Sequence, residues 1–217
     1  MDDHAVDPAR TAVLNIDMQR CFVEGSPLAP PSGLAVLDRV NGVIDACRRL
    51  GMLVIHTRMA IRADGTNTGA AMARLVPTFI RDLYTVGSAQ WELHPGLSVT
   101  SGDVVLDKPR YGAFYGTDLD LILRQRGIDT VVVTGIATNI CCDATAREAA
   151  VRDFFVYFVQ DAAGTMAMNG VTAEDLQSAT CASLGMVFAT IVTGAQLLDL
   201  ASTIGSSPSP ALSVLAS

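Results

Sequence analysis

Short apolar runs rich in Val and Ile recur along this chain and alternate with segments of helical periodicity. Six runs have the length of buried strands: Thr11–Asp17, Met52–Thr57, Asp103–Asp107, Asp129–Thr134, Phe154–Gln160 and Met186–Val192. Helical patterns lie between or after them, at Leu34–Leu50, from Asp118 to Gly127, from Asn139 to Asp153, over Thr172–Leu184 with Thr172 as N-cap, and over Ala195–Ala201. Strands that alternate with helices form a parallel sheet covered on both faces. We therefore expect an α/β fold, a three-layer α/β/α sandwich around a six-stranded, mainly parallel, doubly wound sheet.

The length of the chain, 217 residues with half of them hydrophobic, suits one such domain. We expect residues 1–205 to form this domain. Residues 206–217 are rich in Ser and Pro, which predicts a flexible C-terminal tail.

The formal charge of −7 argues against nucleic acid as a partner, because phosphate binding needs a basic face. No run of about 18 apolar residues is present, and the acidic start lacks the features of a signal peptide. Five cysteines occur without a C-x-x-C pair, as expected for a reduced, cytoplasmic protein without a membrane segment. Metal-binding spacings and glycine-rich nucleotide loops are also missing from the sequence, so neither a metal nor a cofactor is predicted.

Three residues with reactive side chains follow predicted strands. Asp17 closes the first strand, Lys108 follows the third, and Cys141 follows the fourth by one loop. In a doubly wound sheet the ligand lies beyond the carboxyl ends of the strands, near the switch point. We therefore expect these residues to share one rim, with the segment Ala60–Thr100 covering it.

Each of the three also has an ordinary structural interpretation. Asp17 could cap a strand end instead of acting as a general base, and Lys108 could be a plain surface lysine. The position of Lys108 before Pro109 holds it extended, and a cation near a thiol would lower the thiol pKa.

Cys141 could be a small buried apolar residue, as free cysteines usually are. With Thr138 as N-cap, it would lie about three residues into a helix, where the dipole favours a thiolate. Cys142 points about 100° away around that helix. The residue pattern alone leaves open which of the two faces the pocket.

Other chemistries are weaker. His4, His56 and His94 have no motif around them, so a Cys–His pair has little support. A redox pair of Cys141 with Cys142 is disfavoured, because adjacent cysteines rarely form a disulfide without distortion.

Three segments resemble the isochorismatase-like cysteine hydrolases, in the family's order. They are Asp17-Met18-Gln19 with Phe22, then Lys108-Pro109-Arg110-Tyr111-Gly112-Ala113-Phe114, and then Gly135 through Cys141 followed by Ala144–Ala149. The resemblance covers about residues 11–200. It implies Asp17 as base, Lys108 as its companion and Cys141, rather than Cys142, as nucleophile. It further implies a cis peptide between Ile136 and Ala137, an oxyanion hole made by the amides of Ala137 and Cys141, and a homodimer or homotetramer.

Differences between this sequence and some members of the family narrow the range of reactions that we expect. True isochorismatases resemble this chain but lack the thiol, and nicotinamidases have metal ligands where Met59 and Ile61 stand here. The resemblance is greatest to amidohydrolases of ureidoacrylate, N-carbamoylsarcosine and biuret, which implies hydrolysis of a small amide or ureido substrate through a thioester-type intermediate. The alternatives are a vinyl-ether hydrolase, a nicotinamidase-like amidase and a non-catalytic binding protein on the same scaffold.

Candidate residues for substrate binding lie near the three segments or in the covering segment, although aromatic residues at such places are more often part of a core. The candidates are Phe22, Arg58, Trp91, Arg110, Tyr111 and Phe114, with Tyr115 as a further aromatic neighbour. An arginine among them could pair with a substrate carboxylate.

Overall fold

A single six-stranded sheet forms the centre of the computed structural model, which describes residues 6–202. The strands are β1 (Thr11–Ile16), β2 (Leu53–Met59), β3 (Val104–Lys108), β4 (Thr130–Ile136), β5 (Phe155–Gly164) and β6 (Thr190–Val192). Their order is β3-β2-β1-β4-β5-β6, and every pairing is parallel. Strands β2 and β3 thus lie on one side of β1, and β4, β5 and β6 follow in order on its other side. This arrangement confirms the predicted doubly wound sheet and puts the switch point between β1 and β4.

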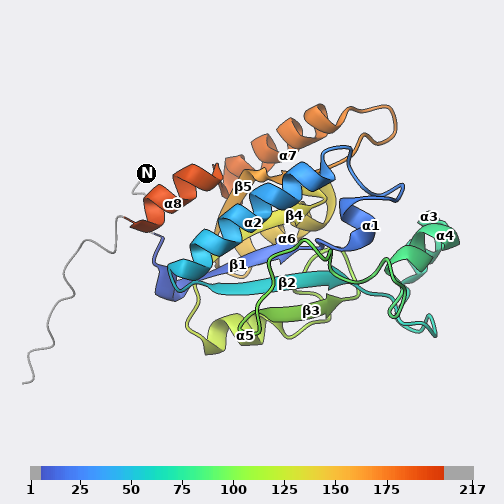
Figure 1. Cartoon of the computed structure of the whole chain (residues 1–217), viewed down its shortest axis with the longest axis horizontal. Coiled ribbons are helices and arrows are strands. Elements are labelled where there is room, and N and C mark those ends of the chain that lie inside the picture. Colours follow the sequence, from blue (N-terminus) through green and yellow to red (C-terminus); the bar gives the residue numbers. More distant parts are fainter. Residues whose placement is uncertain (1–5, 203–217) are drawn as a thin grey trace, which may run out of the picture.

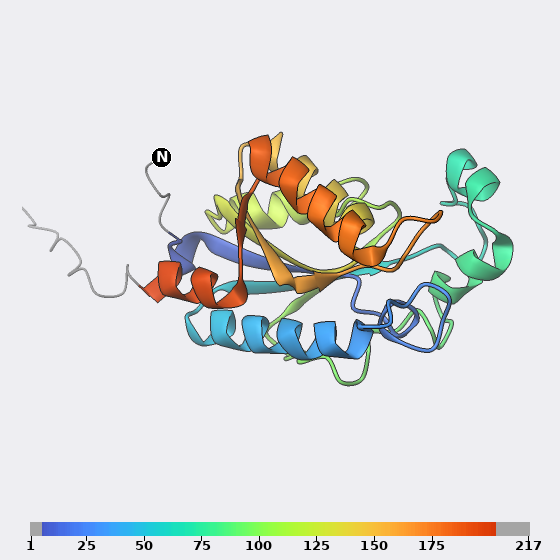
Figure 2. The ribbon, with the colours of Figure 1, turned by 90° about the horizontal axis from the view of Figure 1, so that it is seen from above.

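Helices cover both faces of the sheet (Figures 1 and 2). One face carries α2 (Gly33–Arg49) and α8 (Gly194–Ser202), and the other carries α5 (Leu119–Gln125), α6 (Asp143–Ala150) and α7 (Ala173–Val187). Every residue of β1 and β4 is buried. Strands packed between two helical layers must be apolar on both sides, which explains why they read as continuous Val- and Ile-rich runs.

The remaining helices are short and gather mainly at the carboxyl end of the sheet. They are η1 (Pro8–Arg10), α1 (Arg20–Val23), α3 (Ala70–Leu75), α4 (Thr78–Arg81), η2 (Asp82–Tyr84) and the π-helical turn η3 (Thr138–Cys142). In Figure 1, α3 and α4 lie beyond the arrowheads of β2 and β3, and Figure 2 shows that they stand away from the sandwich.

Several predicted boundaries are wrong, and β5, for example, continues to Gly164 instead of ending at Gln160. The run predicted as a strand from Met186 to Val192 begins in fact inside α7, because Met186 and Val187 continue the helix with their side chains 81% and 72% exposed. Phe188 and Ala189 then both donate to the carbonyl of Leu184, which ends the helix before β6. Apolar composition alone did not separate an exposed helix end from a buried strand.

The predicted helix from Asn139 to Asp153 is divided into η3 and α6. The N-cap prediction for α7 is confirmed, since Thr172 accepts from the amide of Asp175. The predicted tail, residues 206–217, lies outside the described residues.

Candidate active site

Asp17 and Lys108 form an ion pair at the carboxyl end of the sheet. Asp17 directly follows β1, Lys108 is the last residue of β3, and β2 lies between those strands. Lys108 Nζ lies 2.7 Å from Asp17 Oδ2, and both side chains are fully buried. Nζ also donates to the carbonyls of Arg110 (3.0 Å) and Tyr111 (2.9 Å). A charged pair can remain buried in this way because each charge is balanced by the other and by hydrogen bonds to neighbouring groups.

Thr57, on the intervening strand β2, completes the surroundings of the carboxylate. Its hydroxyl donates to Asp17 Oδ1 at 2.7 Å and accepts from the Asp17 amide at 3.2 Å. Asp17 itself has φ 52°, a left-handed conformation that Asp tolerates better than most residues. The chain therefore turns sharply at the end of β1 and holds the carboxylate in place.

Gln19 fixes the loop after β1. Its amide group accepts from the amide of Met59 (2.7 Å) and donates to the carbonyls of Met59 (3.1 Å) and Trp91 (2.7 Å). The two strand ends and the covering segment are thereby tied together around the Asp17–Lys108 pair.

Cys141 belongs to η3, which starts directly after β4. The carbonyl of Ala137 accepts from both Ile140 and Cys142, each at 3.1 Å. The prediction of Thr138 as N-cap is wrong: Ala137 holds that position, and the Thr138 hydroxyl instead donates to Gln177. A glycine is required just before this turn, because a Cβ on Gly135 would come within 2.1 Å of the Ile16 carbonyl oxygen.

The two adjacent cysteines point in different directions. Cys141 lines a cavity, whereas Cys142 is fully buried and directs its sulfur to the Thr134 carbonyl at 3.8 Å. Asp17 and Lys108 are the two charged groups that act on the Cys141 thiol. The structure thus brings Asp17, Lys108 and Cys141 together at one point.

Lys108 acts to lower the pKa of the Cys141 thiol, as expected, but the net pKa of the thiol is raised. Burial raises the pKa of Cys141 to about 12; Lys108 opposes this rise and Asp17 adds to it. Burial also acts to lower the pKa of Lys108, but the negative charge of Asp17 opposes this effect and the net pKa is raised. The resting site therefore contains a neutral thiol beside a carboxylate–ammonium pair, because desolvation penalises the thiolate more than one cation stabilises it.

Alkylation by iodoacetamide at varied pH should report this neutral thiol. With a pKa near 12, the thiolate fraction of Cys141 rises about tenfold per pH unit between pH 7 and 10, and the alkylation rate should follow it. Peptide mapping should find Cys141 modified and Cys142, which has no access to the cavity, unmodified. A rate that reaches its plateau below pH 8 would contradict the neutral resting state.

The cavity above Cys141 has a volume of about 530 Å³. Its walls come from the segment after β1, the end of β2, the segment from α3 to η2, the loop after β3, the start of η3 and the loop after β5. Most of the lining is apolar: Phe22, Pro27, Leu28, Met59, Leu75, Val76, Pro77, Ile80, Ala137, Ile140, Met166, Ala167 and Met168, with Tyr84, Tyr111, Cys141 and Asn169 as the polar members.

Only two of the predicted substrate-binding residues, Phe22 and Tyr111, line this cavity. Phe22 stacks on Tyr84 with ring centroids 6.0 Å apart. Phe114 instead packs in the core against Phe154, at 5.8 Å between ring centroids.

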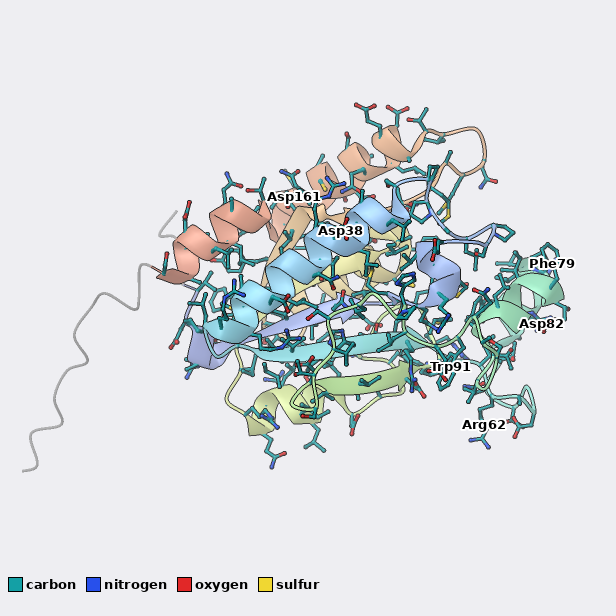
Figure 3. The ribbon with its side chains drawn as sticks, in the orientation of Figure 1. Asp38, Arg62, Phe79, Asp82, Trp91 and Asp161 are labelled. Carbon is teal, nitrogen blue, oxygen red and sulfur yellow. The ribbon has the colours of Figure 1, made fainter. Side chains whose placement is uncertain are left out.

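The predicted arginines have partners of their own. Arg58 stacks on Trp91, 3.9 Å from its ring centroid, and forms an ion pair with Asp107 at 2.7 Å. Figure 3 places Trp91 near the ends of β2 and β3. Arg110 donates to the carbonyl of Asn67 and packs against Gly69, with Tyr115 beside it at 5.9 Å. None of these side chains reaches the lining.

The histidines lie elsewhere. His56 is buried inside the sheet between Asn15 (2.8 Å) and Asp103 (3.2 Å), and His94 contacts Glu24 at 3.0 Å. His4 lies outside the described residues. Neither described histidine lines the cavity, so the geometry does not favour a Cys–His pair.

The peptide bond between Ile136 and Ala137, just before η3, is cis. Ala137 lines the cavity beside Cys141 and is only 8% exposed.

Thr57 and Tyr84 are site residues that the sequence reasoning missed. Thr57 is the final residue of the predicted second strand, so the strand-end rule that selected Asp17 could have selected it too. Tyr84 lies in a segment of weak periodicity, and nothing in the sequence pattern indicated its place in the lining.

No cluster of three metal-ligating side chains occurs in the described part of the chain. A helix long and apolar enough to cross a membrane is likewise absent from residues 6–202.

The fold and the site define a doubly wound α/β protein with a thiol, a carboxylate and an ammonium meeting at its switch point. Residues 11–196 match the family model of the isochorismatase domain. The chain therefore belongs to the isochorismatase family of hydrolases.

Individual relatives support this assignment. The ureidoacrylate amidohydrolase RutB of Klebsiella pneumoniae is 31% identical over 173 residues, covering 71% of this chain and 73% of that protein. A cysteine hydrolase from Pseudomonas syringae superposes with a TM-score of 0.86 at 30% identity, over 94% of this chain and 99% of its own. The N-carbamoylsarcosine amidase from Thermoplasma acidophilum gives a TM-score of 0.71 at 26% identity, over 85% and 96% of the two chains.

Proposed function

We propose that this protein is a cysteine-dependent amidohydrolase that cleaves a C–N bond of a small amide or ureido compound. The observation that carries the proposal is the meeting of the Cys141 thiol with the buried Asp17–Lys108 pair at the floor of a cavity. The names of two relatives, an amidohydrolase of ureidoacrylate and an amidase of N-carbamoylsarcosine, support the choice of substrate class.

Catalysis starts when Cys141 attacks the substrate carbonyl and Asp17 takes the thiol proton. Because the thiol is neutral at rest, proton transfer and attack are coupled, and the negative charge moves from the carboxylate to the substrate oxygen. Lys108 remains charged throughout and stabilises whichever group is negative. A positioned general base of this kind contributes about 10²- to 10⁴-fold to a rate.

The substrate oxygen is then held by the amides of Ala137 and Cys141. The position of both residues in the cavity lining, next to each other in space at the start of η3, supports this role. Each donor of an oxyanion hole contributes about 3 kcal/mol to transition-state stabilisation.

The intermediate collapses when protonated Asp17 gives its proton to the departing ammonia or amine and the C–N bond breaks. The product of this step is a thioester, or a thiocarbamate from a ureido substrate. Water then attacks it, with Asp17 again accepting a proton, and the thiol is restored.

A panel of ureido acids, substituted ureas and primary amides tests the proposal, with ammonia release as the assay. We expect at least one ureido or amide compound to release ammonia in a reaction that the Cys141→Ala variant does not support. Release from no member of the panel would contradict the proposed activity.

Assembly and location remain predictions of the resemblance and the composition. We expect a homodimer or homotetramer, which analytical ultracentrifugation would test, and a cytoplasmic protein that binds neither nucleic acid nor membrane.

A further inference from the structure

The lining of the cavity carries no formal charge within the described residues. Its polar groups other than the thiol are uncharged: the phenols of Tyr84 and Tyr111 and the side chain of Asn169. The nearest ammonium, Lys108, is balanced by Asp17 at 2.7 Å. A substrate that carries its own charge would therefore enter a site without a counter-charge.

The arginines next in sequence to lining residues do not themselves line the cavity. Arg74, beside Leu75 in α3, is exposed to solvent. Arg81 in α4 donates to the carbonyl of Val76 (3.1 Å) and the hydroxyl of Thr78 (2.9 Å). Arg110 donates to the carbonyl of Asn67 (2.8 Å). Both of these guanidinium groups are thus engaged with the backbone or side chains of the covering segment.

The end of the cavity away from the thiol is markedly apolar. Leu75, Val76, Pro77 and Ile80 form it, and Leu75 is 77% exposed although it faces the cavity. Figures 1 and 2 show the corresponding helices, α3 and α4, standing away from the sandwich. An apolar group bound here would remove this exposed hydrocarbon from water, which favours binding, whereas a carboxylate would lose its hydration without gaining a partner.

Resting on the proposed function, we propose that the substrate is a neutral N-substituted urea or primary amide whose distal group is apolar and contacts Leu75. The scissile carbonyl lies at Cys141, and the distal hydrocarbon or aromatic group lies against α3 and α4. The protein would thus differ in specificity from an enzyme that acts on a ureido acid.

Matched compounds that differ only in the distal group test this proposal. We would compare 3-methylbutylurea with 3-ureidopropionate, and 5-methylhexanamide with 4-carbamoylbutanoate, because a branched hydrocarbon has nearly the shape of a carboxylate. We expect kcat/KM to be on the order of 100-fold higher for each neutral compound. Equal or faster turnover of the acids would overturn the proposal.

A charge introduced at Leu75 tests where the distal group lies. Leu75→Arg places a cation on a side chain that is already exposed, so the fold should tolerate it. We expect it to reduce the preference for the neutral compounds by about tenfold or more, while the matched variant Leu75→Met, which keeps an apolar side chain of similar size, retains the wild-type preference. The same preference in both variants would overturn the contact with Leu75.

Binding to the Cys141→Ala variant separates this proposal from the proposed function. Titration calorimetry of the same pairs measures preference without turnover. Tighter binding of the neutral compounds, with no ammonia released by the wild-type protein, would support the specificity and contradict the activity. Tighter binding of the acids, or binding of neither, would overturn the specificity.

Discussion

Replacing Cys141 by Ala is expected to lower kcat by about a million-fold, to the limit of detection in an ammonia-release assay. The thiol is the only nucleophile among the described residues that line the cavity with both Asp17 and Lys108 in reach. Cys141→Ser should be nearly as inactive, since an alcohol is a weaker acid than a thiol and Asp17 would have to remove a more tightly held proton.

The neighbouring cysteine provides the matched control. Cys142→Ala removes a sulfur of equal size from a fully buried site that faces the Thr134 carbonyl instead of the cavity. This variant should retain activity within a few-fold and lose only a little stability through the small void. Comparable losses in the two alanine variants would mean that both act through the packing of η3, and the nucleophile assignment would be wrong.

Asp17→Asn is expected to reduce kcat by about 10⁴-fold, because it removes the proton acceptor while preserving the shape of the side chain. It should also lower the free energy of unfolding by about 3–5 kcal/mol, since Lys108 would stay fully buried without its counter-charge. Asn accepts the left-handed conformation that Asp17 adopts, so backbone strain adds little to this loss.

A double-mutant cycle separates the charge effect from general damage. Lys108→Met alone should destabilise comparably, whereas Asp17→Asn combined with Lys108→Met should destabilise by about 0.5–3 kcal/mol less than the sum of the two. Asp107→Asn is the control on the same strand, because its ion pair with Arg58 is partly exposed and should contribute below about 1 kcal/mol. Urea unfolding curves measure all four, and additive effects would contradict the coupled pair.

The sheet could be predicted because its physical signals are local. Continuous apolar runs indicate strands buried on both faces, and glycines such as Gly51 and Gly127 mark helix ends with positive φ. Asp17 and Lys108 could be placed on one rim from these runs alone, because parallel strands end on the same side of their sheet. The α7 boundary failed where an apolar helix end is exposed, a difference that composition does not encode.

The properties that could not be predicted from the sequence depend on distances between side chains and on their burial. The thiol pKa was expected to fall beside Lys108, but its direction is set by how completely the fold removes Cys141 from water. Arg58 and Trp91 were expected to bind substrate, yet the Arg58 guanidinium stacks on the Trp91 ring, 3.9 Å from its centroid. Tyr84 is more than sixty residues from Phe22 in the sequence. It lines the cavity beside Phe22 only because the covering segment folds back over the site.

A buried neutral thiol has a consequence for selectivity. If the thiol stays protonated until a carbonyl occupies the cavity, we expect the unliganded protein to react slowly with oxidants and alkylating agents. Asp17, the proton acceptor, is paired with Lys108 and fixed by Thr57. In this mechanism the thiol becomes nucleophilic only when substrate is bound, because the free enzyme does not hold it as a thiolate.

The most direct measurement is mass spectrometry of protein quenched with acid during turnover of a substrate identified in the panel. Acyl or carbamoyl transfer to Cys141 predicts a single adduct of the corresponding mass on the peptide that contains residues 138–147, sensitive to hydroxylamine and absent from Cys141→Ala. Ammonia release by Cys141→Ala at the wild-type rate, or an adduct on another residue, would contradict covalent catalysis by this thiol.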